Sequence, residues 1–150
     1  LLSSASEVDV VAKALCDEME PSMQHNNIDD YRKVIIAKRP IITSTEGRVP
    51  RYGLEFHPWE SWKTDKNPLW WRSYNDVKHH RNEHYNKANL ENTLNAAASL
   101  FVLVLHLYRG ANSAKELTPV PQLFLSSLYN IPPNPANLTF EGLHMLSLPR

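Results

Sequence analysis

The sequence predicts a mainly α-helical bundle with a small β-hairpin or irregular insertion and a proline-rich C-terminal arm. Apolar residues recur at three- and four-residue spacings over most of residues 1–109, as they do in amphipathic helices. That period is lost over about 41–66, and the last forty residues hold six of the 11 prolines. We therefore expect one helical domain over 1–110, with its insertion at about 41–66, followed by an arm over 111–150.

Composition limits the class of protein. A chain of 150 residues can bury one core of ordinary size. The 16 Lys and Arg balance the 16 Asp and Glu, so binding to nucleic acid or to a membrane surface would need a local patch of charge. Cys16 is the only cysteine, which excludes an intramolecular disulfide and a Cys-rich zinc site and suits a reducing cytoplasm. We expect a cytoplasmic protein.

Two amphipathic helices are expected at the start of the chain. Pro21 ends the first of them, and Asn27 is expected to cap a second helix over Ile28–Lys38, which Pro40 stops. The first helix is predicted by apolar residues at helical spacing, namely Leu1, Ala5, Val8, Val11, Ala12, Leu15 and Met19.

The insertion has a different pattern from the helices. Residues 41–59, IITSTEGRVPRYGLEFHPW, contain β-branched residues, two glycines and two prolines without a helical period. This composition is typical of a short hairpin, with its turn near Glu46 and Gly47, or of an ordered loop.

Two further helices complete the predicted bundle. Asn67 followed by Pro68 predicts a helix start, with Asn67 as the cap, and the helix is expected to run to about Tyr85. Another helix is expected from about residue 87 to 109, where Gly110 stops it. Its apolar run AAASLFVLVLHLY predicts a buried core helix rather than a membrane span, because the run is short and contains a histidine.

The arm combines prolines with large apolar side chains. Its prolines prevent a long helix, but its apolar content is too high for a disordered segment. We expect an extended arm that packs on the domain or on a partner subunit through Leu123, Phe124, Leu125, Leu128, Tyr129, Phe140, Leu143 and Met145.

The third predicted helix separates aromatic from charged residues. At about 100° per residue, Arg72 and His79 fall nearly in register two turns apart, with Asn75 and Asp76 between them. The guanidinium suits a phosphate, and an imidazole exchanges a proton near neutral pH. Together they could position a phosphodiester and take the proton of a ribose 2′-hydroxyl. The other side carries Trp70, Trp71, Tyr74, Val77, Lys78, Arg81 and Tyr85.

Two other interpretations of this helix stay open. Every surface helix carries charge on its outer face, where Arg72 and Asp76 could form an ordinary i,i+4 pair. His80 and His84 have the spacing of a helical zinc pair, but the sequence H-R-N-E-H differs from H-E-x-x-H and no third ligand is evident. We expect no metal site. Glycine-rich phosphate loops are missing from the sequence, and we expect no cofactor.

The segment WWRSYNDVKHHR, followed by a long apolar helix, resembles the HEPN (higher eukaryotes and prokaryotes nucleotide-binding) superfamily. The resemblance rests on the motif R-x(4-6)-H, which reads Arg72-SYNDVK-His79 here. The stretch also resembles a Y-N-x-x-K-H signature of uncharacterised HEPN-like bacterial proteins, through Tyr74, Asn75, Lys78, His79 and Arg81.

This resemblance implies a dimeric four-helix bundle that cleaves RNA without a metal ion. Arg72 would hold the scissile phosphate, His79 would act as general acid or base, and Asn75 would orient the imidazole or a phosphate oxygen. Lys78, Arg81 and Tyr74 would contact the RNA or nucleotide. Many such proteins work in prokaryotic defence or toxin-antitoxin systems, which implies an antitoxin or defence partner. The alternative is a non-catalytic module that binds a nucleotide or another protein through the same polar face.

Overall fold

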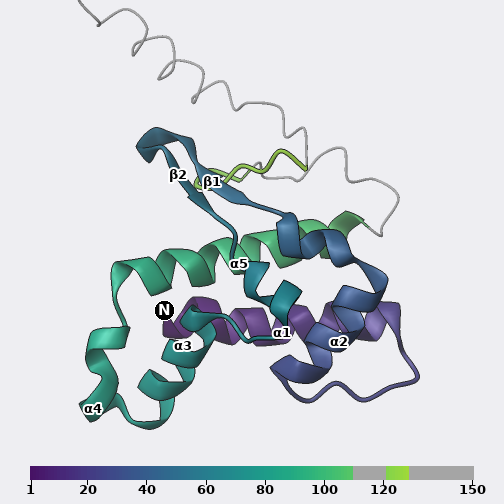
Figure 1. Cartoon of the computed structure of the whole chain (residues 1–150), viewed down its shortest axis with the longest axis horizontal. Helices are drawn as coiled ribbons and strands as arrows, with labels where there is room; N and C mark the ends of the chain where they lie inside the picture. The colour runs from purple at the N-terminus through teal and green to yellow at the C-terminus, as the bar shows by residue number, and fades with distance from the viewer. Residues whose placement is uncertain (110–120, 129–150) are drawn as a thin grey trace, which may run out of the picture.

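The computed structural model describes residues 1–109 and 121–128 and is mainly helical, as predicted (Figure 1). A two-stranded antiparallel sheet forms the insertion, and short 3-10 helices lie in the connections. The elements are α1 (Leu2–Met19), α2 (Ile28–Lys38), η1 (Pro40–Ser44), β1 (Gly47–Val49), η2 (Pro50–Tyr52), β2 (Leu54–Phe56), η3 (Glu60–Thr64), α3 (Leu69–His79), α4 (Arg81–His84), η4 (Tyr85–Lys87) and α5 (Leu90–Arg109).

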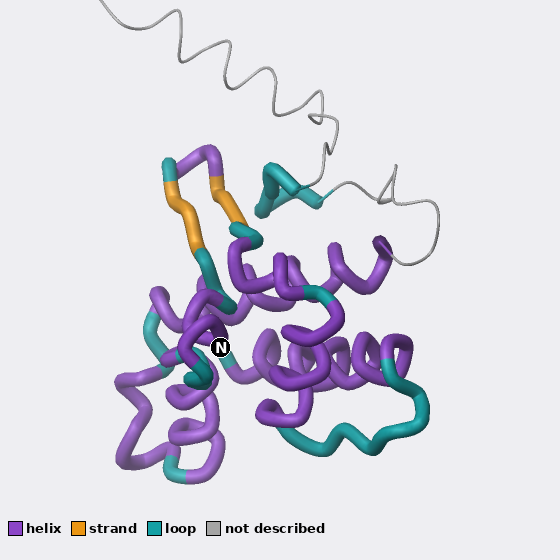
Figure 2. Tube along the Cα trace, turned by 45° about the vertical axis from the view of Figure 1, so that its right-hand side comes forward, coloured by secondary structure: helices purple, strands orange, loops and turns teal. Residues whose placement is uncertain are grey.

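The two long helices, α1 and α5, lie side by side, with α2 and α3 also packed against α1 (Figure 1). The β1–β2 hairpin projects from the helical body next to α5 (Figure 2). The turn through α4 lies at the other end of the molecule from the hairpin in both views. The hairpin and α4 thus mark opposite ends of the fold.

The first two helices have the predicted ends. Helix α1 ends at Met19, just before Pro21. The Asn27 side chain accepts hydrogen bonds from the backbone N–H groups of Asp29 and Asp30, at 3.0 and 3.1 Å, and so caps α2 as predicted.

The prediction of one helix from Pro68 to about Tyr85 is wrong. Helix α3 ends at His79, and His80 takes a non-helical conformation with φ −135° and ψ 55° before the single turn of α4. No residue from 78 to 91 is buried, so beyond Val77 a continued helix would have no apolar face to pack.

The predicted cap of α3 is also wrong. Pro68 occupies the cap position, and no side chain caps this helix end. The side-chain oxygen of Asn67 instead accepts a hydrogen bond from the Arg32 guanidinium at 2.5 Å, and its side-chain NH2 group donates to the Asp29 carboxylate at 3.1 Å. Asn67 therefore ties the start of α3 to α2.

The hairpin turn lies at a different place from the one predicted. Gly47 sits in β1 opposite Phe56, and the chain reverses over Pro50–Gly53, where Gly53 has a φ of 61°. Gly47 packs closely against α5, because a Cβ at this position would lie only 3.2 Å from the Cβ of Ala98.

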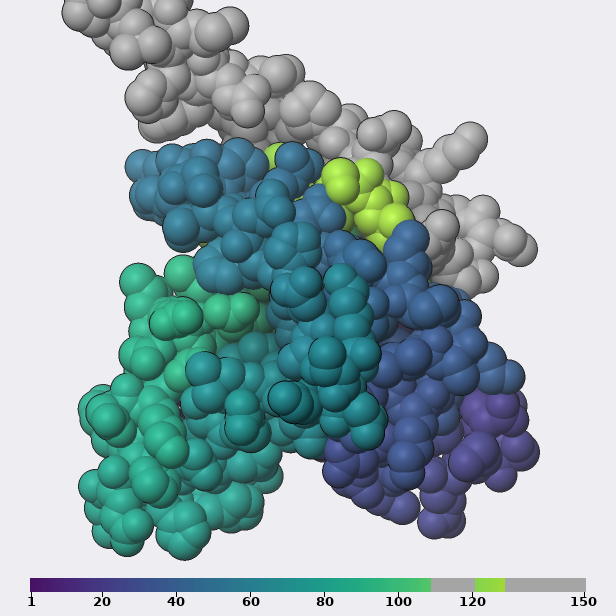
Figure 3. Space-filling model, in the orientation of Figure 1, coloured from purple at the N-terminus to yellow at the C-terminus, as the bar shows by residue number. Residues whose placement is uncertain are grey.

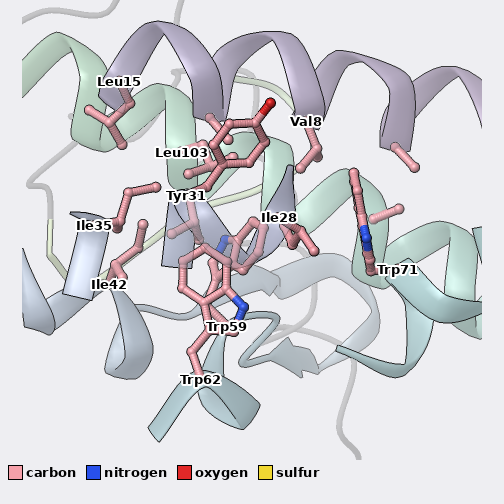
Figure 4. Packing of buried hydrophobic residues seen from close by; sticks show 14 of the residues in the cluster. Val8, Leu15, Ile28, Tyr31, Ile35, Ile42, Trp59, Trp62, Trp71 and Leu103 are labelled. Carbon is pink, nitrogen blue, oxygen red and sulfur yellow. The ribbon is translucent and has the colours of Figure 1, made fainter. Parts of the chain in front are cut away.

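The main core lies between α1, α2, α5 and the segments that carry the tryptophans (Figure 4). Trp59 is fully buried, and its ring centroid lies 4.2 Å from that of Trp62 and 5.4 Å from that of Trp70. The Trp59 indole donates a hydrogen bond to the backbone oxygen of Ser99 on α5 at 3.3 Å. Trp59, Trp62 and Trp70 thus belong to the packed interior.

Residues 121–128 pack on the domain. Leu125 and Arg48 exchange two backbone hydrogen bonds of 2.8 and 2.9 Å, and Phe124 is 5% exposed. The Ser127 N–H donates to the Glu46 carboxylate at 2.5 Å. Burial alone would raise the pKa of Glu46, but the hydrogen bonds from Ser127 and the charge of Arg48 lower it. The predicted arm residues Tyr129, Phe140, Leu143 and Met145 lie outside the described residues.

Helix α5 is long and apolar enough over Leu90–Tyr108 to cross a membrane by length and composition. In this fold 44% of an 18-residue part of that stretch is buried, and α1 packs against the helix. That it is a core helix rather than a membrane span stays a prediction.

Candidate functional site

The two residues of the R-x(4-6)-H motif lie on one exposed face of α3. Arg72 and His79 are both exposed, and neither side chain forms a hydrogen bond or ion pair within residues 1–109 and 121–128. Their Cα atoms are about 10 Å apart along the helix axis, at a rise of 1.5 Å per residue. Both side chains are therefore available to a ligand lying along α3.

The polar residues between them are held by other contacts. Asn75 is half-buried, and its amide donates to the backbone oxygen of Trp71 at 3.1 Å. Asp76 forms an ion pair of 2.7 Å with Lys87 on η4 rather than with Arg72. The hydrogen bond from Lys87 lowers the pKa of Asp76, and nearby positive charge adds to this effect. This ion pair joins α3 to the turn that follows α4.

The three residues expected to contact RNA differ in exposure. Tyr74 is 6% exposed, and its ring packs 5.3 Å from that of Trp71. Lys78 is exposed, with its ammonium group 5.5 Å from the Tyr74 ring centroid, and the exposed Arg81 guanidinium lies 6.0 Å from that of Tyr85. Tyr74 therefore belongs mainly to the core, and only Lys78 and Arg81 present an exposed cation.

Positive charge gathers on residues 69–89, which we name the α3–α4 corner. It carries four strong cations against two acids, a net charge of +2, together with three histidines. By contrast, α1 carries four acids and one lysine, a net charge of −3. The neutral chain is thus polarised, with a local basic patch of the kind that polyanion binding needs. The charged residues of the corner are Arg72, Asp76, Lys78, Arg81, Glu83 and Lys87.

The histidines of the α3–α4 corner do not form a metal centre. The rings of His80 and His84 meet edge to face, with centroids 6.3 Å apart. Over the described ranges, no group of three or more His, Cys, Asp or Glu side chains could hold a metal ion.

The thiol of Cys16 is buried in the core. Cys16 is fully buried in α1, and burial raises the pKa of its thiol to about 12. It is a small core residue, as its apolar neighbours in the sequence indicate.

A cleft beside α3 includes residues that the sequence did not single out. It has a volume of about 590 Å³ and lies between η3, the start of α3 and the first turns of α5. Figure 3 shows η3, in teal, on the near face of the molecule. Ser61, Asn92 and Asn95 line the cleft. These residues come from separate segments and form no motif, so no sequence pattern could have grouped them.

Comparisons of this chain with protein-family models, with curated proteins and with solved structures found no match. The argument for function therefore depends on the geometry and chemistry of the α3–α4 corner itself.

Proposed function

We propose that this chain is a HEPN-like ribonuclease that works without a metal ion, as a cytoplasmic effector of a prokaryotic defence or toxin-antitoxin system. The observation that carries the proposal is the exposure of Arg72 and His79, without partners in the described structure, on one face of a helix whose surroundings are basic. An arginine for the phosphate and an imidazole for the proton are the two groups that RNA transesterification needs.

The state of three other arginines contrasts with that of Arg72. Arg32 contacts Asp29 and Asp65, Arg39 contacts Glu18, and Arg48 contacts Glu46. Each would have to give up a carboxylate to bind a phosphate. Among the residues that the structure describes, Arg72 has no such contact to lose, so its guanidinium donors can bind a ligand.

The chemical step follows from the two groups. The His79 imidazole accepts the proton of the ribose 2′-hydroxyl as the 2′-oxygen bonds to phosphorus. The bond from phosphorus to the 5′-oxygen breaks, and the leaving oxygen takes a proton from water. The products are a 2′,3′-cyclic phosphate and a 5′-hydroxyl, and the imidazolium returns its proton to solvent. The Arg72 guanidinium stabilises the charge on the phosphoryl oxygens.

The spacing of the two groups favours a site shared by two copies of the chain. The attacking oxygen and the phosphate it attacks are within about 3.5 Å of each other in a reactive geometry. Two turns of α3 separate Arg72 from His79 in one copy, about 10 Å along the axis. Two antiparallel copies of α3 would set Arg72 of each copy beside His79 of the other. We therefore propose a homodimer.

The test is cleavage of a mixed, end-labelled RNA pool by the purified chain in EDTA. The wild type is expected to release fragments ending in a 2′,3′-cyclic phosphate, and Arg72→Ala and His79→Ala are each expected to lose about 100-fold or more in rate. The matched control is Arg51→Ala, which removes an exposed arginine of η2 instead of one of α3.

Two results would overturn the proposal. One is the absence of cleavage by a folded, dimeric wild type, which would leave the basic corner as a binding surface for a nucleotide or a partner protein. The other is cleavage that persists in both variants, which would point to a contaminating nuclease or to a different site.

A further inference from the structure

We propose that the outer edge of β1 and the apolar pocket beside it form a binding site for an extended peptide strand, with phenylalanine and serine two residues apart. Residues 121–128 of the chain itself have this pattern and occupy the site in the structure (Figure 1). The ligand is a partner strand of the same chemistry, which binds by displacing segment 121–128. The site lies at the hairpin end of the molecule, and the proposal does not depend on the ribonuclease activity.

Segment 121–128 adds a third strand to the two-stranded sheet. Along one edge β1 pairs with β2, where Arg48 lies opposite Glu55. At the other edge the Arg48 N–H donates to the backbone oxygen of Leu125 at 2.8 Å, and the Leu125 N–H donates to the backbone oxygen of Arg48 at 2.9 Å. Addition of a strand to a sheet edge is a recurring mode of peptide recognition, in which side-chain pockets decide which peptide binds.

The pocket beside β1 favours an aromatic side chain. The Phe124 ring stacks on Phe101 with centroids 5.6 Å apart and meets Phe56 edge to face at 6.4 Å. A Cβ at Gly47 would lie 3.5 Å from the Phe124 ring and 3.2 Å from the Cβ of Ala98. The missing side chain of Gly47 therefore leaves room for the ring. The two ring contacts favour an aromatic residue over an aliphatic one.

The second position of the pattern requires a small side chain. Phe124 and Ser126 are 5% and 3% exposed, whereas Leu123 is 50% exposed. Successive side chains of a strand point to opposite faces, so Phe124 and Ser126 face the domain together and Leu123 faces away from it. A larger residue in place of Ser126 would have to displace its neighbours. The site thus distinguishes strands at two positions and tolerates change at Leu123.

The Glu46 carboxylate sets the register of the bound strand. This side chain is mostly buried, and it accepts a hydrogen bond from the backbone N–H of Ser127 at 2.5 Å. A hydrogen bond from an N–H group to an ionised carboxylate is stronger than one between neutral groups. Because the donor is a backbone group, the bond fixes where the strand lies along β1 and leaves the choice of residue to the pocket.

The contacts of segment 121–128 are separate from the main core. Phe124 belongs to a smaller cluster with Val49 and Ala98, whereas the main core lies between α1, α2 and α5. The segment can therefore leave while the main core stays packed. The parts of the site that remain, namely the β1 edge, the ring pocket and the carboxylate, all belong to residues 46–101. A partner strand that makes the same contacts can then take the place of the segment.

The test is binding of synthetic peptides to the whole chain carrying Phe124→Ala, which empties the ring pocket. The peptide PQLFLSSL, identical to residues 121–128, is titrated into the chain and followed by NMR. It should bind the variant about tenfold or more tightly than the wild type, in which the tethered segment competes for the site. The amide signal of Arg48 should shift, while those of α3 stay unchanged.

Peptide variants test the pattern without changing the fold of the chain. Peptides with Phe124→Ala or Ser126→Leu should each bind about tenfold more weakly than the parent peptide. The matched control is the peptide with Leu123→Ala, which should bind within about twofold of the parent because this side chain is half-exposed. Leu125→Pro in the chain provides a second receptor, since it removes the N–H that the segment donates to Arg48.

Two results would overturn the proposal. One is the absence of binding by PQLFLSSL to both receptor variants when their circular dichroism spectra match that of the wild type. The other is equal binding of the parent, Phe124→Ala and Ser126→Leu peptides, which would show that the pocket does not select the strand. Either result would leave segment 121–128 as a structural part of the domain, whether or not the chain cleaves RNA.

Discussion

Phe124 is predicted to fix residues 121–128 to the domain, and Phe124→Ala tests this directly. Its ring is 5% exposed and lies between two other rings. It stacks on Phe101 with centroids 5.6 Å apart, and it meets Phe56 edge to face at 6.4 Å. Ala98 and Val49 complete this second, smaller core.

The expected loss can be worked out from these contacts. A buried phenylalanine removes about 150 Å² from water, which at about 25 cal/mol per Å² is close to 4 kcal/mol. The segment can, however, leave the domain instead of keeping a cavity, because apart from Phe124 it is held mainly by the Arg48–Leu125 backbone pair and by Ser127 with Glu46. We therefore expect a loss of about 3 kcal/mol in the free energy of unfolding.

The assay is urea denaturation together with hydrogen exchange. In Phe124→Ala, the Leu125 and Arg48 amides should exchange much faster, while amides in α1 and α5 stay protected in the native state. Leu123→Ala is the control, because this neighbour is 50% exposed and should cost less than about 0.5 kcal/mol. A loss below about 1 kcal/mol with the Leu125 amide still protected would refute the reasoning.

Three further predictions concern the buried residues Gly47, Glu46 and Cys16. Gly47→Val should lower the free energy of unfolding by about 2 kcal/mol in urea melts, because a Cβ at this position would already lie 3.2 Å from the Cβ of Ala98. An unchanged urea midpoint would contradict this packing. The pKa of Glu46 is lowered from its ordinary value of 4.5, so its ionised form contributes stability above pH 4.5, and this contribution is lost as the pH falls through the lowered pKa. Glu46→Gln should therefore weaken the pH dependence of the urea midpoint below pH 4.5. An unchanged pH dependence would exclude the hydrogen bond from Ser127. Cys16, with a thiol pKa of about 12, should react with iodoacetamide at pH 8 only as fast as the chain opens, and rapid labelling of the folded protein would contradict its burial.

Local signals predicted the ends of the first two helices well. Asn27 and the acids after it mark the start of α2, because capping depends on neighbouring residues alone. The end of α3 could not be predicted in this way. Residues 80–85 contain no proline or glycine to stop a helix, and α3 ends because nothing packs against it beyond Val77. The role of Asn67 could not be predicted from its neighbours in the sequence either, because its partners Arg32 and Asp29 lie on a different helix.

The sequence predicted which face of α3 carries the candidate site, but not the contacts of its residues. The helical period places Arg72 and His79 on one face, and the structure keeps that arrangement. The sequence also offered Asp76 as a partner for Arg72. Asp76 instead contacts Lys87, which the chain brings back to α3 after the break at His80. The break brings Lys87 to Asp76, and no rule of helical spacing predicts it.

The most direct test of the shared active site is to mix the Arg72→Ala and His79→Ala chains. Each variant alone should be inactive on RNA in EDTA. After unfolding and refolding together, half of the dimers should contain one copy of each, and each mixed dimer should carry one intact pair of Arg72 and His79. The account predicts recovery of roughly a quarter of the wild-type cleavage rate. No recovery in a mixture shown to contain mixed dimers would contradict it.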